Sequence, residues 1–308
     1  MGKYEFTVVE EKKIDVIIDS DVKNEADDQY AITHALLTPM FRLHGVIASH
    51  FGHDRIKDSL EASWQELLKV VKYAGFEGKV KTVKGAPTML KKGEKGYFSK
   101  IEPLDSDGAR LIIDTALSLP VGRKLYIGVL GPLTNVASAL LLEPRIENKI
   151  SVIWNGGGLY PDGGPEFNLV NDIVAANVVF SSKVELSQVP TKTYGLPRVS
   201  LAELQTKVLP YGEIGNFLFH MTLDFFEEMK NEATWPRPES LDICDETVIA
   251  LLMEEHRYCY TLHKAPFIGD DMFYRGSDEN RPIKVFDEID ARYVLEDLFA
   301  KLKINYGD

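Results

Sequence analysis

Short apolar runs alternate with stretches of helical periodicity through the first two thirds of the chain. The apolar runs predict buried strands at 16–18, 43–49, 79–83, 125–130, 150–154 and 191–194. Apolar residues at helical spacing predict helices at 30–37, 58–74, 109–119, 134–142 and 173–180. Strands that alternate with helices are typical of a parallel sheet with helices on both faces. We therefore predict an α/β fold with an open, mostly parallel sheet and a site at the carboxyl ends of its strands.

The last third of the chain is dominated by longer helices. Amphipathic patterns predict helices at 215–230 and 245–260, connected through the rigid Pro-containing segment 235–238. The segment 289–302 resumes the pattern of a strand followed by a helix. The chain has no internal repeat, low-complexity tract or linker-like stretch that would mark a boundary. The sequence therefore predicts one domain over residues 1–308.

The composition is that of a folded, acidic protein. Of the 308 residues, 44% are hydrophobic and 27% are charged, and 35 Lys and Arg against 47 Asp and Glu give a net charge of −12. This balance excludes general disorder. It also disfavours nucleic-acid binding, because contacts to phosphates need clustered Lys and Arg.

Cysteine use and hydropathy point to a compartment. No apolar run approaches the roughly 18 residues that span a bilayer, so we expect no membrane partner. The two cysteines, Cys244 and Cys259, do not make a disulfide framework, and the N-terminal residues do not resemble a signal peptide. We therefore expect a cytoplasmic protein.

An acidic cluster follows the first predicted strand. Residues 19–28 read Asp-Ser-Asp-Val-Lys-Asn-Glu-Ala-Asp-Asp and carry five carboxylates. Crowded carboxylates repel one another unless a cation or raised pKa values relieve the charge, and Ca²⁺ and Mg²⁺ prefer such oxygen ligands. The alternative is a helix cap next to a solvated acidic turn. Zinc is disfavoured because no Cys and His residues have ligand spacing.

The spacing Asp19-x-Asp21 also occurs in the haloacid-dehalogenase-like phosphohydrolases, which continue it as Asp-x-Asp-x-Thr/Val. Lys23 stands at the last position of that motif and breaks it. The pair Asp270 and Asp271 resembles the late acidic motif of that family. A magnesium-dependent phosphohydrolase with Asp19 as its nucleophile is therefore an alternative function.

Four stretches together resemble the calcium-dependent nucleoside hydrolases over most of the chain. The opening motif of that family is Asp-x-Asp-Pro-Gly-x-Asp-Asp; here two residues are inserted between Asp21 and Asp27, and the Pro-Gly is absent. The Gly-Pro-Leu-Thr-Asn at 131–135 resembles the strand-to-helix turn of the family, and the Glu-Phe-Asn at 166–168 resembles its sugar-binding segment. Asp245 falls where the family has a late metal ligand.

The resemblance implies a reaction and a metal site. The reaction is hydrolysis of the N-glycosidic bond of a ribonucleoside, or a related ribosyl compound, to free base and ribose, with a calcium-bound water as nucleophile. Asp21 would be both a calcium ligand and the general base, and Asp28 the bidentate ligand. Thr134 would contribute its backbone carbonyl, and Asp245 would complete the coordination.

The resemblance also implies a substrate site for a small nucleoside. Asp27 would accept a hydrogen bond from the ribose 2′-hydroxyl, and Glu166 and Asn168 would hold the far side of the ribose. His53 would contact the ribose or protonate the leaving base. Asp19 is expected to support the acidic loop from behind.

The acid that protonates the leaving base is not assigned by the sequence. Cys244 occupies the position of a histidine that often assists this step in the family, but a thiol is a weak donor. The remaining candidates are His220, His256, His263 and Tyr258. A protein that binds calcium and a sugar without turnover is a third alternative, and the resemblance implies a homodimer or homotetramer.

Overall fold

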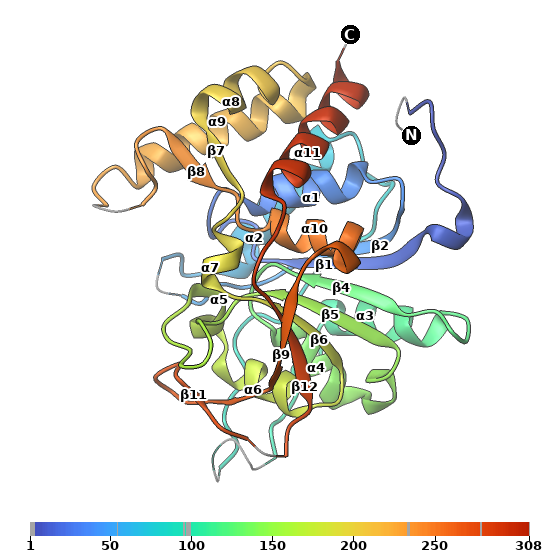
Figure 1. The fold of residues 1–308 in the computed structure, drawn as a ribbon, viewed down its shortest axis with the longest axis vertical. Helices are drawn as coiled ribbons and strands as arrows, with labels where there is room; N and C mark the ends of the chain where they lie inside the picture. Colours follow the sequence, from blue (N-terminus) through green and yellow to red (C-terminus); the bar gives the residue numbers. More distant parts are fainter. Residues whose placement is uncertain are drawn as a thin grey trace.

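The computed structural model describes residues 4–53, 55–94, 96, 100–232, 235–277 and 279–307. A sheet of eight strands, in the order β3-β2-β1-β4-β5-β6-β12-β9, runs through the centre of the molecule (Figure 1). Neighbouring strands are parallel except for β9, which is antiparallel to β12. The strands are β1 (Ile14–Ser20), β2 (Phe41–Ala48), β3 (Thr82–Lys84), β4 (Leu125–Val129), β5 (Ile150–Asn155), β6 (Glu185–Val189), β9 (Tyr260–Lys264) and β12 (Pro282–Phe286). The predicted α/β fold with an open, mostly parallel sheet is confirmed.

Helices cover both faces of this sheet, and each face has its own apolar core (Figure 1). This arrangement explains why the central strands are apolar on both sides: Ile17 packs into one core and Ile18 into the other. One core includes α1 (Asp28–Leu37), α2 (Ser59–Tyr73), α8 (Leu201–Lys207), α9 (Gly212–Glu228), α10 (Glu246–Glu254) and α11 (Ala291–Tyr306). The other includes α3 (Asp107–Ser118), α4 (Thr134–Leu142) and α6 (Ile173–Ser181).

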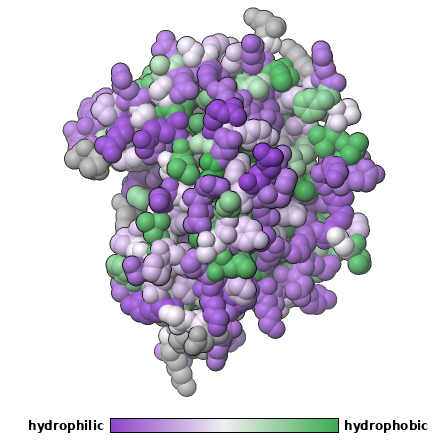
Figure 2. Space-filling view, viewed as in Figure 1, coloured by the Kyte–Doolittle hydropathy of each residue, from purple (hydrophilic) through white to green (hydrophobic). Residues whose placement is uncertain are grey.

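The remaining elements are short and lie between these layers or at their edges. They are the two-stranded sheets β7 (Arg198–Ser200) with β8 (Ser240–Asp242) and β10 (Phe267–Ile268) with β11 (Tyr274–Arg275), the helices α5 (Phe167–Asn171) and α7 (Thr191–Tyr194), and the 3₁₀ turns Glu10–Lys12, Pro144–Ile146 and Glu255–Arg257. Within the described residues no helix is long and apolar enough to cross a membrane. The face seen in Figure 2 is mostly hydrophilic, with scattered hydrophobic residues.

The structure corrects three of the predicted elements, and it adds β6, which the sequence did not predict. Residues 191–194 form α7 instead of a strand, because the carbonyl of Pro190 accepts hydrogen bonds from the Thr193 and Tyr194 amides at 2.8 and 3.1 Å. The helix predicted at 245–260 ends at Glu254, so that Tyr260 already begins β9. The strand predicted within 289–302 lies earlier, as β12, and α11 occupies most of that range.

A close approach between β4 and α10 places a helix start over the carboxyl end of the sheet. A Cβ atom on Gly128 of β4 would lie 2.8 Å from Cγ1 of Val248 and 3.1 Å from Cδ1 of Leu252, both on α10. Glycine therefore lets α10 pack directly onto the strand. Asp245, which precedes α10, is held at the edge where β1, β4 and β5 end.

We predict that Gly128→Ala destabilises the protein by about 1–3 kcal/mol, because the added methyl group overpacks the contact with α10. Urea unfolding measures the change. Gly276→Ala is the matched control, since a Cβ atom at Gly276 meets nothing within 4 Å. Equal stability of the two variants would contradict this view of the contact.

Candidate functional site

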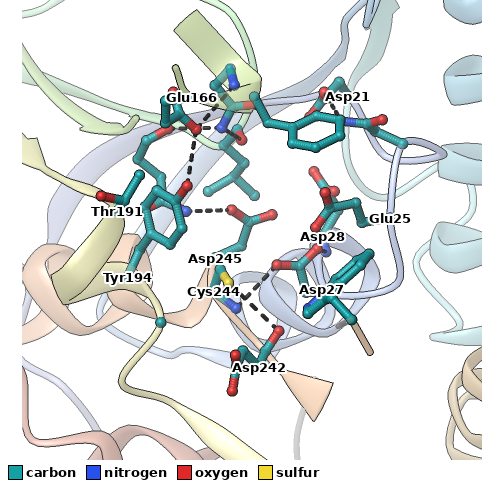
Figure 3. Close-up of a pocket in the computed structure, with 17 residues that line it drawn as sticks. Asp21, Glu25, Asp27, Asp28, Glu166, Thr191, Tyr194, Asp242, Cys244 and Asp245 are labelled. Atoms are coloured by element: carbon teal, nitrogen blue, oxygen red, sulfur yellow. Dashed lines mark hydrogen bonds between the residues drawn. The ribbon is translucent and has the colours of Figure 1, made fainter. Parts of the chain in front are cut away.

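The carboxyl ends of β1, β4 and β5 open into a pocket of about 360 Å³. This volume lies within the range of roughly 300–1,000 Å³ that is common for small-molecule sites. Figure 3 shows acidic side chains on one side of the pocket and Glu166 and Tyr194 on another. The predicted location of the site, at the carboxyl ends of the strands, is the location of this pocket.

Three aspartates converge at the bottom of the pocket, from the starts of two helices. Asp27 caps α1, Asp28 is its first residue, and Asp245 immediately precedes α10. One carboxylate oxygen of each lies within 4.8 Å of the others (Figure 3). All three side chains are buried, with 2–4% of their surface exposed. Of the carboxylates predicted to share one ion, Asp28 and Asp245 belong to this group, and Asp27 stands in it where Asp21 was predicted.

Neighbouring polar groups orient these three carboxylates. The Ser20 hydroxyl donates to Asp28, and the amide of Asn155, at the end of β5, donates to Oδ1 of Asp245 at 2.9 Å. Asp27 accepts from the Asp28 backbone amide at 3.1 Å and from the Cys244 backbone amide at 3.0 Å. Asp27 thus joins the start of α1 to the segment that leads into α10.

The two-residue insertion forms a turn that keeps Asp21 in the pocket. The Asn24 side chain donates to Oδ2 of Asp21 at 3.1 Å, and the Asn24 backbone amide donates to the Asp21 carbonyl at 2.8 Å. Arg55 in turn donates to the carbonyl and side-chain oxygens of Asn24. The Asp21 carboxylate packs against Gly131, where a Cβ atom would lie 2.8 Å from Oδ1. The turn also places Glu25 in the lining.

Burial makes this group of acids hard to ionise. Burial, and then the charge of Asp28, raises the pKa of Glu25 to about 7 and that of Asp21 well above its usual range. Burial raises the pKa of Asp28 to about 6, and burial followed by repulsion from neighbouring acids raises the pKa values of Asp27 and Asp245. Among the described residues, no Lys or Arg lines the pocket to balance the charge.

The donor set fits a hard divalent cation. Two oxygens bound to one Ca²⁺ at 2.3–2.6 Å lie at most roughly 5 Å apart, and the three aspartate oxygens meet this condition at 4.8 Å or less. Carboxylates suit Ca²⁺ or Mg²⁺ better than the N and S donor sets of zinc sites. The cluster can therefore hold a metal ion.

Glu166 and Asn168 line the opposite side of the pocket. Glu166 caps α5 and accepts hydrogen bonds from the backbone amides of Gly157, Asn168 and Leu169 at 2.7–3.1 Å, and from the Tyr194 hydroxyl at 3.1 Å. Burial raises its pKa. The Asn168 amide nitrogen donates to the carbonyls of Leu130 and Asn155 at 2.7 and 2.8 Å, which leaves its amide oxygen as an acceptor.

Asp19 lies behind the pocket and does not line it. Ser49 donates to its Oδ1, and the Asn135 amide lies 3.0 and 3.3 Å from its two oxygens. Burial raises its pKa to about 7. The expected supporting role of Asp19 agrees with these contacts, whereas a phosphohydrolase nucleophile would need an open approach. Asp271, of the other motif for that function, is in an exposed ion pair with Arg275 at 2.8 Å.

The structure does not bring Thr134 and His53 to the pocket. Thr134 is the first residue of α4, and its hydroxyl donates to Asp172 at 2.8 Å. Leu130, directly after β4, does line the pocket, and its carbonyl accepts the Asn168 amide at 2.7 Å. His53 is exposed, with Nδ1 3.0 Å from the carbonyl of Lys57. These positions correct the roles predicted for both residues.

The four candidate acids named above also lie outside the pocket lining. His220 and His256 are exposed, His263 stacks on Tyr160, and Tyr258 lines a separate cavity. Cys244 and Tyr194 do line the pocket, and burial raises the pKa of each, so both hold their protons at neutral pH.

Several lining residues were missed by the sequence prediction. Asn155 had a detectable signal, because it is a polar residue at the end of an apolar strand. Leu130 had none, because an apolar residue directly after an apolar strand looks like part of the core. Asn24, Tyr194 and Trp235 reach the pocket through loop and turn geometry that has no periodic pattern in the sequence.

Comparison with known proteins points to one family. The family model described as inosine-uridine preferring nucleoside hydrolase matches residues 16–296. The pyrimidine-specific ribonucleoside hydrolase RihB of Escherichia coli is 29% identical over 229 residues, which cover 69% of this chain and 71% of RihB.

Two solved structures share the fold. The purine-preferring ribonucleoside hydrolase from Gardnerella vaginalis is 19% identical, with a TM-score of 0.74 over 94% of this chain and 98% of that one. The plant nucleoside hydrolase PpNRh1 is 19% identical, with a TM-score of 0.71 over the same shares of the two chains. Because the family model matches nearly the whole chain, this protein belongs to the inosine-uridine preferring nucleoside hydrolase family.

Proposed function

We propose that the acidic pocket is the active site at which this nucleoside hydrolase cleaves the N-glycosidic bond of a ribonucleoside to give free base and ribose. The convergence of Asp27, Asp28 and Asp245 within 4.8 Å is the observation that carries the proposal. We infer that the cation held there is calcium, because the donors are several carboxylate oxygens from the starts of two helices. Calcium binding would relieve the repulsion among the buried acids.

Different residues of the pocket would bind the cation and accept the proton. Asp28 and Asp245 would hold the ion together with one oxygen of Asp27, and Asp21 and Leu130 line the pocket beside them. A bound divalent cation would supply Lewis acidity and fix hydroxyl groups of the substrate. Asp21 is the candidate general base, because it is a carboxylate that lines the pocket beside the three converging aspartates.

The opposite side of the pocket is suited to the ribose and the base. Asp27 and the amide oxygen of Asn168 are acceptors for ribose hydroxyls, and Glu166 holds the α5 start that presents Asn168. Phe167 and Trp235 line the pocket and offer aromatic faces to a base. Cys244 and Tyr194 are protonated groups within this lining.

Release of free ribose from a panel of purine and pyrimidine nucleosides tests the function. We expect ribose release that stops when a chelator removes the metal and returns when calcium is added. Release of phosphate from sugar phosphates would instead support the phosphohydrolase alternative. Nucleoside binding without ribose release would support a non-catalytic role.

The resemblance also supports a homodimer or homotetramer, and the cysteine use supports the cytoplasm; both remain predictions. Sedimentation of the purified chain measures the oligomeric state.

Asp21→Ala tests the assignment of the base. We predict that turnover falls by about 10²–10⁴-fold or more, while the thermal unfolding profile stays that of a folded protein. Asp114→Ala is the matched control, because Asp114 is exposed on α3, which packs on the opposite face of the sheet from α1 and α10. A nearly normal rate for Asp21→Ala would exclude it as the base.

Asn168→Ala tests the ribose side of the pocket. Loss of one hydrogen bond to substrate is worth roughly 1 kcal/mol, so we predict that KM rises by about fivefold with a smaller change in kcat. Asn177→Ala is the matched control, since the Asn177 amide also donates to two carbonyls, at 2.8 and 3.1 Å, but lies outside the pocket. An unchanged KM for Asn168→Ala would count against the role.

A further inference from the structure

A largely buried cluster of ionisable side chains connects the two helices that carry the aspartates. It consists of His34 on α1, Glu246 on α10, and Asp297 and Lys301 on α11. The side chains of His34 and Glu246 have no exposed surface. None of the four lines the pocket, so substrate and cation do not contact them.

His34 is the centre of this cluster. Its Nδ1 lies 2.7 Å from Oε2 of Glu246, and its Nε2 lies 2.9 Å from Oδ2 of Asp297. The ammonium of Lys301 pairs with Asp297, lies 3.2 Å from His34 Nε2, and donates to the Thr38 hydroxyl at 2.8 Å. One imidazole therefore ties α1 to both α10 and α11.

Stability alone does not account for this cluster. Removing charged groups from water is costly, and buried ion pairs are often no more stabilising than apolar residues of the same volume. Oε1 of Glu246 is also buried with no hydrogen-bond partner, which adds to the cost. What the contact does supply is a fixed distance and rotation between α1 and α10, of the kind that apolar packing specifies less strictly.

The position of the contact relates it directly to the cation site. Glu246 follows Asp245 in the chain, and His34 is six residues after Asp28, about 9 Å along the helix axis. A shift of α10 along α1 would therefore separate the carboxylates of Asp28 and Asp245. In the structure, oxygens of both are within 4.8 Å.

We propose that His34 is a positioning residue for the cation site, and that its contact with Glu246 holds α10 against α1 so that Asp28 and Asp245 converge on one ion. This inference rests on the proposed function, and it assigns a role to residues outside the pocket.

The variant H34L separates a positioning role of His34 from an electrostatic one, because the two roles predict opposite changes in calcium affinity. Replacing an imidazole with an apolar side chain removes no negative charge, so a field effect would leave calcium binding unchanged or strengthen it. Loss of the contact that positions α10 would instead weaken calcium binding. Titration calorimetry of the metal-stripped full-length protein with calcium chloride should show affinity at least about 10-fold lower, as when groups that orient metal ligands are lost.

A second pair of variants keeps the test decisive if H34L does not fold. The double variant H34L/E246L removes both the imidazole and the carboxylate, so that neither is left buried without its partner. Asp297 still pairs with Lys301. E246Q loses the same negative charge as H34L/E246L but keeps an acceptor for His34. We expect H34L/E246L to bind calcium at least about 10-fold more weakly than E246Q, even where its thermal stability equals that of the wild type.

H44L is the matched structural control. His44 contacts Asp15 at 2.8 Å, near the amino end of β1 and away from the pocket, so its loss should affect stability and leave calcium affinity unchanged. Wild-type affinity in both H34L and H34L/E246L would overturn the inference. D245N tests the site itself: if the wild type does not bind calcium, or D245N binds it equally well, the proposed cation site and the inference both fail.

Discussion

Three buried aspartate carboxylates lie within 4.8 Å of one another in a pocket whose described lining contains no Lys or Arg. Carboxylates in such a place must share protons or a cation. Much of the surrounding structure serves to hold them there. Ser20 and Asn155 donate to two of the carboxylates, the Cys244 amide donates to the third, and Gly131 gives Asp21 room beside them. A cation at this position turns a destabilising concentration of charge into a binding site.

The fold brings the acids together because parallel strands end at a common edge. β1 supplies the loop that contains Asp21, Leu130 directly follows β4, and β5 ends at Asn155. Helix α10 begins at the same edge because Gly128 lets it pack onto β4. The His34–Glu246 contact then links α10 to α1. Precise placement of the ligands thus depends on helix packing as much as on the acidic loop.

The sequence predicted those features that depend on hydrophobic periodicity or on motifs. The alternation of strands and helices predicted the sheet, and Thr134–Leu142 was predicted with its observed bounds. β6 (Glu185–Val189) was missed because Ser187 and Gln188 make an interior strand look polar, although both are fully buried. The cluster formed by Asp28 and Asp245 was predicted because acidic motifs remain recognisable despite the insertion.

Features that depend on three-dimensional geometry were not predictable. Leu130 lines the pocket, but it is an apolar residue directly after a strand, so its residue type carries no signal, and the motif pointed to Thr134. His53 was placed by motif position, but the loop directs it to solvent. The contact between His34 and Glu246 joins residues 212 positions apart. Neither lies in a motif, so only the packing of α1 against α10 reveals it.

The most direct measurement of the central claim is the free energy of unfolding in chelator and in saturating calcium, at pH 5 and at pH 8. Burial raises the pKa of Asp28 to about 6 and that of Glu25 to about 7 in the folded state, whereas unfolded carboxyl groups titrate near about 4. The folded, cation-free protein therefore binds extra protons below these values, and this contribution to stability is lost as pH rises through them.

If a cation relieves the repulsion, calcium must compete with those protons. We therefore expect stabilisation by calcium to be larger at pH 8 than at pH 5, by at least about 1 kcal/mol. No stabilisation by calcium at pH 8, or the same stabilisation at both pH values, would contradict the claim that these carboxylates are built around a divalent ion.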